Sequence, residues 1–86
     1  MTEYKVRQQR IDGTTYQEFS NDLNSIQDTD ITLDFSEVKM ITSVGIGAIL
    51  KATHRGQKIK VINASNLVIE IFKVIGLDES YISNDM

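Results

Sequence analysis

The sequence predicts a small α/β domain, with a mostly parallel β-sheet that carries helices, and three observations support this fold class. Segments with the period-two pattern of strands alternate along the chain with segments of helical spacing. The order strand–helix–strand–helix–strand–helix implies parallel strands joined by helical crossovers. The 86 residues contain no repeat or linker, so we expect a single domain over 1–86.

The N-terminal half predicts two strands and a helix. In EYKVRQQRI, Tyr4 and Val6 alternate with basic residues, which indicates a half-exposed strand near a sheet edge. After the DGTT turn, Thr15 and Glu18 have the spacing of a capping box at a helix start. The turn QDTD then leads to ITLDF, which alternates at period two and predicts a second strand over 31–35. The apolar residues on one face of the helix are Tyr16, Phe19, Leu23 and Ile26.

The C-terminal half predicts two helices around a third strand. A connection, SEVKM, leads to the helix VGIGAILKATHRG, which Gly56 ends in a left-handed C′ position. KIKVINA predicts the strand, and Ser65 caps a last helix that ends at Gly76, before the tail LDESYISNDM. Basic residues at the end of the second helix face its negative dipole end: Lys51, His54 and Arg55. The apolar residues of the last helix are Leu67, Val68, Ile71, Phe72 and Ile75.

Composition argues against several classes of function. The net charge is −3 and the chain has no concentrated basic stretch with aromatic residues, so we expect no nucleic-acid partner. With no cysteine and one histidine, we expect no disulfide, metal or cofactor, and a reducing compartment is natural. The N-terminus has no signal-peptide pattern and the apolar runs are too short to cross a bilayer. The sequence therefore predicts a cytoplasmic protein without membrane association.

Catalysis is not expected. Ser43 and His54 are eleven positions apart on one helix, about 16 Å, which is too far for a nucleophile–base hydrogen bond. GIGAIL has a leucine in the third glycine position of a phosphate loop, so we interpret Gly45 and Gly47 as permitting close approach of the helix to the sheet. Asp34, near a strand end, lacks the acidic pair of a phosphoacceptor site, and we expect it at an exposed strand position.

Ser43 is the strongest candidate functional residue, because ITSVGIG places a hydroxyl at a helix start. One interpretation is that this hydroxyl caps the helix. Another is that the free amides and positive dipole end accommodate a phosphoserine. A phosphate adds about −1.5 to −2 charges at pH 7 and can disrupt an apolar interface. Such a site would switch binding without catalytic machinery.

The stretch DFSEVKMITSVGIGAILKA…GQKIKVINASNLVIEIFKVIGLDESY resembles a STAS domain of the anti-sigma factor antagonist type. RIDGTTYQEF also resembles the acidic turn and first helix of that family, with Asp12 at the turn, so the resemblance covers about 4–81. The resemblance implies the STAS fold. Antagonists of this type carry an additional N-terminal strand, and here only EYKVRQQRI precedes the first helix, which implies a shorter sheet with an edge open to pairing.

The resemblance also implies a binding module rather than an enzyme. In this family an anti-sigma factor that is a serine/threonine kinase binds and phosphorylates the domain, and a PP2C-type phosphatase reverses the modification. Matched to the motif Asp-Ser-Ser/Thr-Gly, Ser43 is the phosphorylated residue and Gly45 holds the glycine position. Thr42 and Val44 replace the aspartate and the second hydroxyl residue of the motif.

The partner-binding surface that we expect surrounds Ser43 and includes five neighbours: Asp12, Gly13, Thr42, Val44 and Gly45. The replacements in the motif keep an alternative open. STAS domains also act as constitutive accessory subunits of signalling or transport complexes, without phosphorylation.

Overall fold

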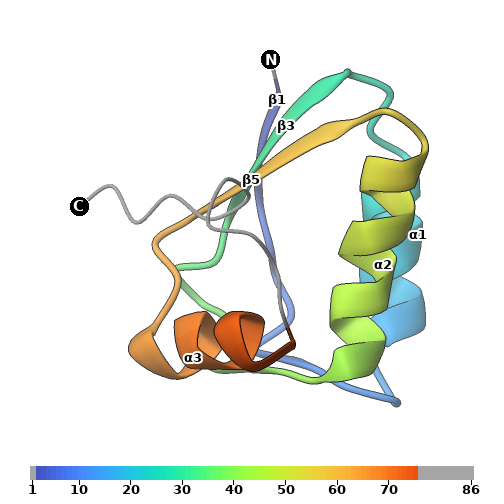
Figure 1. The fold of residues 1–86 in the computed structure, drawn as a ribbon. Helices are drawn as coiled ribbons and strands as arrows, with labels where there is room; N and C mark the ends of the chain where they lie inside the picture. The colour runs from blue at the N-terminus through green and yellow to red at the C-terminus, as the bar shows by residue number, and fades with distance from the viewer. Residues whose placement is uncertain (1, 76–86) are drawn as a thin grey trace.

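The computed structural model describes residues 2–75 (Figure 1), so the predicted helix end at Gly76 and the tail after it lie outside the described residues. It confirms the predicted fold class, with three helices and parallel strands. In chain order the elements are β1 (Thr2–Lys5), β2 (Arg10–Ile11), α1 (Tyr16–Asn24), β3 (Asp30–Asp34), β4 (Met40–Ile41), α2 (Ser43–His54), β5 (Lys58–Ile62) and α3 (Asn66–Ile75).

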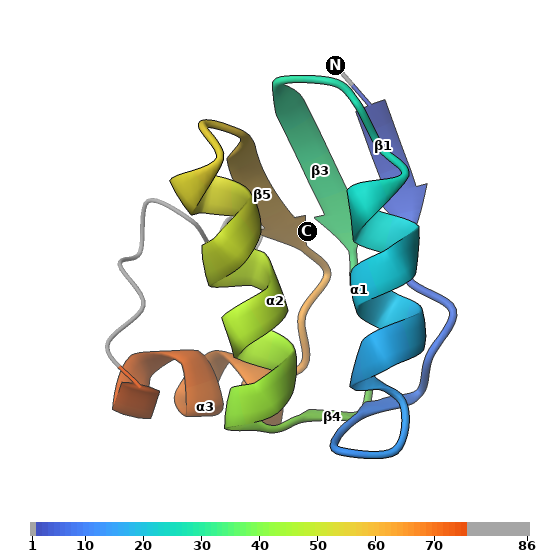
Figure 2. The same cartoon turned by 90° about the vertical axis from the view of Figure 1, so that its right-hand side faces the viewer.

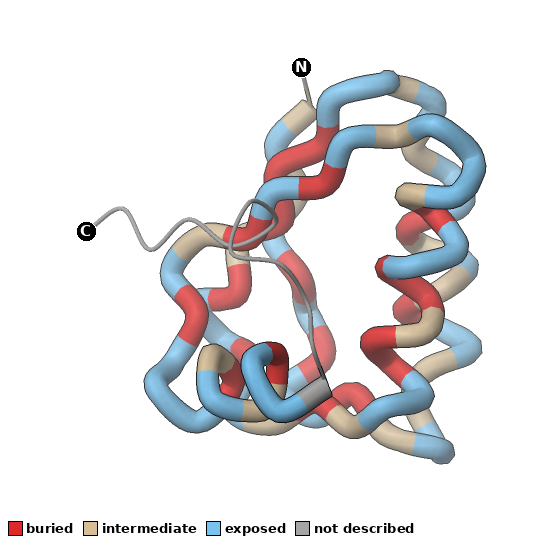
Figure 3. Tube along the Cα trace, in the orientation of Figure 1, coloured by how far each residue is buried: buried red, intermediate tan, exposed pale blue. Residues whose placement is uncertain are grey.

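A parallel sheet of three strands in the order β1-β3-β5 forms the scaffold, and β1 is at its edge as predicted. Tyr4 lies opposite Leu33, and Leu33 lies opposite Val61. These side chains share one face of the sheet. Helices α1 and α2 run side by side across that face (Figure 2). Their buried residues are turned toward the sheet, which places the core between the two layers (Figure 3).

A second, two-stranded parallel sheet joins β2 to β4, with Ile11 opposite Ile41. The single strand expected over EYKVRQQRI is therefore wrong. The amide of Val6 still donates to the carbonyl of Asp34 on β3, but by β2 the chain pairs with β4 instead. Val6 and Gln8 are both buried, so the alternation continues although the partner strand changes. The end of the connection SEVKM, Met40, likewise begins β4, which is too short to have a period.

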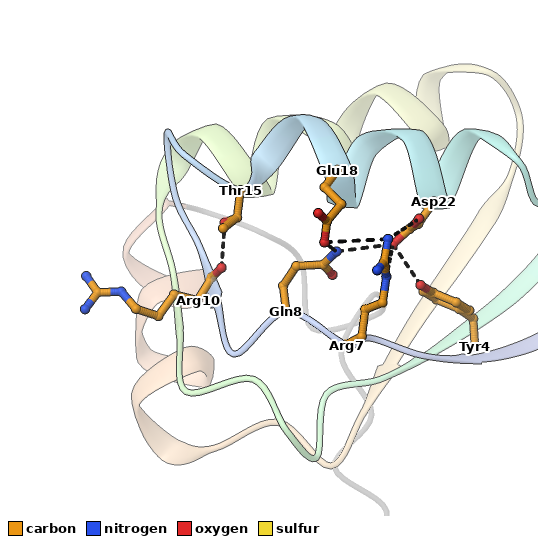
Figure 4. A network of polar contacts seen from close by, with 7 residues as sticks. All are labelled: Tyr4, Arg7, Gln8, Arg10, Thr15, Glu18 and Asp22. Carbon is orange, nitrogen blue, oxygen red and sulfur yellow. Dashed lines mark hydrogen bonds and ion pairs between the residues drawn. The ribbon is translucent and has the colours of Figure 1, made fainter.

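The predicted capping box at the start of α1 is also wrong. Thr15 is the N-cap residue, but its side chain makes no cap hydrogen bond. Its hydroxyl donates to the carbonyl of Arg10 at 2.6 Å instead (Figure 4). The carboxylate of Glu18 accepts from Nε2 of Gln8 at 2.8 Å. Tertiary partners therefore hold both side chains, and α1 ends at Asn24, earlier than the apolar periodicity indicated.

The helix-terminus predictions for Gly56 and Ser65 are confirmed. Gly56 has φ +93°, and its amide donates to the carbonyl of Thr53 while the amide of Gln57 donates to that of Ala52. These two bonds form a Schellman motif at the end of α2. At the start of α3, the hydroxyl of Ser65 accepts from the amide of Val68 at 3.2 Å, which is an N-cap bond.

Helix α3 lies below the sheet, near the start of α2 (Figures 1 and 2). Phe72 packs against Phe35 with 6.1 Å between the ring centroids, and Val68 is also fully buried. Leu67, another of the apolar residues at helical spacing, is 51% exposed and so lies outside the core. Its position one residue before Val68 turns it toward the helix flank.

A polar cluster connects α1 to β1 and to the segment that follows it (Figure 4). The carboxylate of Asp22 accepts from Nε of Arg7 at 3.0 Å, from the hydroxyl of Tyr4 at 2.9 Å and from Nε2 of Gln8 at 3.2 Å. The hydrogen bond from Arg7, with those from Gln8 and Tyr4, lowers the pKa of Asp22 although partial burial opposes this. The Asp22 carboxylate is therefore an anionic hub.

The hub makes stability sensitive to acid. A carboxyl group whose pKa is lower in the folded state contributes stability above its ordinary pKa of about 3.9, and loses that contribution as the pH falls through the folded value. We expect Asp22→Asn to flatten the fall in the free energy of unfolding below about pH 4, because Asn has no charge to lose. Urea unfolding between pH 2.5 and 6 measures this, with Asp30→Asn, at an exposed strand position, as the control. Parallel acid profiles for Asp22→Asn and the wild type would contradict the hub.

Two glycines of α2 differ in what surrounds them. A Cβ on Gly45 would collide with Cγ2 of Ile11 and lie 2.8 Å from Cγ1 of Ile41. The prediction of close approach to the sheet is therefore confirmed for Gly45. A Cβ on Gly47 would meet nothing within 4 Å, so the same prediction is wrong for Gly47, which points away from the core.

We expect Gly45→Ala to lower the free energy of unfolding, because overpacking against Ile11 and Ile41 costs about 1–3 kcal/mol. Gly47→Ala is the matched control in the same helix, and it should raise that free energy by about 0.5–1 kcal/mol through helix propensity alone. Urea unfolding of both variants measures the difference. Equal stabilities would show that the chain relaxes around residue 45.

Candidate functional site

The short β2–β4 pairing brings two distant turns together. Asp12 follows Ile11 at the end of β2, and Thr42 follows Ile41 at the end of β4. Ile11 and Ile41 are register partners in a parallel pair, so both chains leave the ladder in the same direction. The amide and hydroxyl of Thr42 both donate to the carbonyl of Ile11, at 2.9 and 3.3 Å. The structure thus gathers the predicted site residues at one end of the molecule.

Asp12 organises the first of these turns. Its carboxylate accepts from the hydroxyl of Thr14 at 2.6 Å and from the amide of Thr14 at 2.9 Å. These hydrogen bonds lower the pKa of Asp12, and Arg10 adds a smaller effect of the same sign. Its carbonyl accepts from the amide of Tyr16 at 2.8 Å, at the start of α1. Asp12 is therefore an ionised, half-buried turn residue, and the next residue, Gly13, is exposed.

Thr42, and not Ser43, is the N-cap residue of α2. Its backbone is extended, with φ −101° and ψ 174°, and its carbonyl accepts from the amide of Ile46 at 3.1 Å. The interpretation of Ser43 as the helix cap is therefore wrong, because α2 begins at Ser43, one residue earlier than the sequence indicated. Ser43 is the first helical residue and is exposed, and no hydrogen bond within residues 2–75 involves its side chain.

The start of α2 is electropositive. The amides of its first turn have no partner inside the helix, and the helix dipole is positive at this end. No acidic residue lies in that turn. Val44 is 43% exposed beside Ser43, whereas Gly45 is buried against β2 and β4. Of the neighbouring pair, only Val44 is available to a partner.

A groove extends from Ser43 between α1 and α2, with a volume of about 180 Å³. Its lining includes five residues that sequence reasoning did not single out for a site: Tyr16, Ser20, Gly47, Ala48 and Lys51. The sequence contained a signal for this surface, because Ser43, Gly47 and Lys51 recur every four residues and so share a face of α2. Only the packing of α1 beside α2 shows that this face borders a groove.

The structure also separates the other polar candidates from this site. Ser43 and His54 are the first and last residues of α2, so they form no catalytic pair. Asp34 is half-buried rather than exposed, because it accepts from the amide of Ser36 at 2.9 Å and from Nδ2 of Asn63 at 3.1 Å. Burial opposes ionisation of Asp34, but these bonds outweigh it and lower its pKa. Asp34 shapes the turn after β3.

Within residues 2–75, no three His, Asp or Glu side chains are placed to hold a metal ion together. None of the described helices has the length and apolar character needed to cross a membrane.

Comparison with known proteins agrees with the fold. The family model described as the STAS domain matches residues 4–85. No curated protein matches the chain significantly. A solved structure, that of a sulfate transporter family protein from Wolinella succinogenes, aligns with a TM-score of 0.70 at 15% identity, over 94% of this chain and 74% of that one. At this identity the alignment shows a shared fold alone, whereas the family model spans nearly the whole chain, and the protein therefore belongs to the STAS domain family.

Proposed function

We propose that this STAS domain is a cytoplasmic regulatory module that binds an anti-sigma factor-type serine/threonine kinase, and that phosphorylation of Ser43 switches this binding off. A PP2C-type phosphatase would restore the binding form. The observation that carries the proposal is the exposure of the Ser43 hydroxyl. Its hydroxyl is exposed at the first position of α2 and is not used within the described fold.

The surroundings of Ser43 support modification by a kinase. Thr42 holds the preceding backbone in an extended conformation, and its side chain is directed to Ile11 rather than over Ser43. The free amides at the start of α2 would donate hydrogen bonds to the phosphate oxygens, so the modified domain would stay folded. A dianionic phosphate beside exposed Val44 would oppose burial of that side chain in a complex.

A second candidate function is a constitutive accessory subunit of a signalling or transport complex. Thr42 stands where antagonists have an aspartate, which removes a charge beside the modified serine. The same fold also occurs in a sulfate transporter family protein. In this case the surface around α2 would bind its partner without a switch.

We expect Ser43→Asp to weaken binding to the kinase while leaving the fold intact. A carboxylate at the first helical position is favourable to the helix dipole by about 0.3–1 kcal/mol, so stability should stay equal or rise. Calorimetric titration of wild type and variant against an anti-sigma factor-type kinase from the same organism measures the effect. Equal affinities would reject the switch and favour the constitutive subunit.

We expect Ser43→Ala to change the free energy of unfolding by less than about 0.5 kcal/mol, because Ser43 is not the helix cap. Thr42→Ala is the matched comparison, and it should destabilise more because it removes the bond to Ile11.

The intact mass of the wild-type protein purified from its own cells, with phosphatases inhibited, should include a single phosphate increment on Ser43. A mass that stays unmodified across growth and stress conditions would contradict the proposal.

A further inference from the structure

Gly47 has no structural explanation within the described fold. It lies in the interior of α2, where glycine costs about 0.5–1 kcal/mol relative to alanine. A side chain at this position would meet nothing within 4 Å, and the positive φ angle that glycine permits is found at Gly56 and not here. Gly45, two residues earlier, is fully explained by its contact with Ile11.

The open space over Gly47 is the groove between α1 and α2. Val44 and Ala48 lie beside Gly47 on α2, and Tyr16 and Ser20 line the α1 side. A larger residue at position 47 would project into this groove without touching the core. The absence of a side chain therefore leaves room for a group that comes from outside the domain.

The residues that line the groove carry positive charge and no negative charge. Lys51 is exposed and is the only charged residue among its lining residues. At the other end of the groove, Ser43 begins α2, where the helix dipole is positive and the first turn contains no acid. A partner would therefore place an apolar side chain over Gly47 and carboxylates toward the two ends.

We propose that this groove is the docking site for an acidic amphipathic helix of the partner protein. A third helix can lie between two neighbouring helices, and a glycine lets it approach closely, in the helix-in-groove mode of recognition. This inference rests on the proposed function, since it uses the same start of α2, and it specifies the chemistry of the partner. It also gives the switch a cause, because a phosphate on Ser43 would repel the carboxylates of that helix.

The test is a titration of the ¹⁵N-labelled protein with a synthetic helical peptide that carries leucines on one face and glutamates at its borders. A matched peptide has lysines in place of the glutamates. We expect saturable shifts of the amide signals along the groove with the acidic peptide and not with the basic one. The absence of shifts at millimolar peptide, equal binding of both peptides, or shifts confined to the exposed residues of α3, Leu67 and Val74, would overturn the proposal.

Two variants make the test specific. Gly47→Leu fills the groove and should weaken the acidic peptide about tenfold or more, as expected when an anchor side chain loses its pocket. Lys51→Glu should weaken the acidic peptide and strengthen the basic one, which also provides a test if Gly47→Leu does not fold. Leu50→Gln, at an exposed position of α2 outside the groove lining, should leave binding unchanged. Unaltered binding in both groove variants would reject the site.

The outcomes separate this inference from the proposed function, because the peptide titration requires neither a kinase nor a phosphate. If Ser43→Asp does not affect the kinase but the acidic peptide binds over Gly47, the switch is wrong and the groove stands. If the kinase responds to Ser43→Asp but the acidic peptide does not bind, the groove is wrong and the switch stands.

Discussion

The candidate site depends on the contact between Gly45 and the ladder of two residue pairs formed by β2 and β4. Ile11 and Ile41 face each other in this ladder, and the absence of a side chain on Gly45 lets α2 begin directly against them. The extended backbone of Thr42 then connects β4 to the helix, with its amide and hydroxyl bonded to Ile11. Because this packing fixes the first turn of α2, the position of Ser43 at the surface follows from it.

The charge that lines the groove beside Ser43 is opposite in sign to the net charge of the chain. The chain is acidic overall, yet the groove beside Ser43 contains no acid among its lining residues and one base, Lys51. Two carboxylates elsewhere are held by partners of their own. Asp22 accepts from Arg7 and Asp12 accepts from its own turn, which lowers the pKa of both, and neither is among the lining residues of the groove. A negative group added at Ser43 would therefore oppose the positive charge of Lys51 and of the start of α2.

The sequence by itself determined the α/β class, the three helices and the chemistry of two helix ends. These features rest on interactions between residues that are a few positions apart. The Schellman motif needs the left-handed conformation of Gly56 and two local backbone bonds, and the cap of α3 needs Ser65 and an amide three residues later. Residue types at short spacing are sufficient for such predictions. The same holds for the placement of Ser43 near a helix start and for its distance from His54.

Only the tertiary structure decided which atoms form the site. β4 has two residues and no detectable period, so its pairing with β2 cannot be predicted from the sequence. The assignment of Thr42 as the N-cap residue depends on this pairing and cannot be predicted either. Glu18 does not form the predicted capping box, because its carboxylate accepts a hydrogen bond from Gln8, ten residues earlier in the sequence. Gly45 and Gly47 are alike in sequence, but one faces the ladder and the other faces the groove. Contacts between distant segments decide each of these cases, and local propensity carries no information about them.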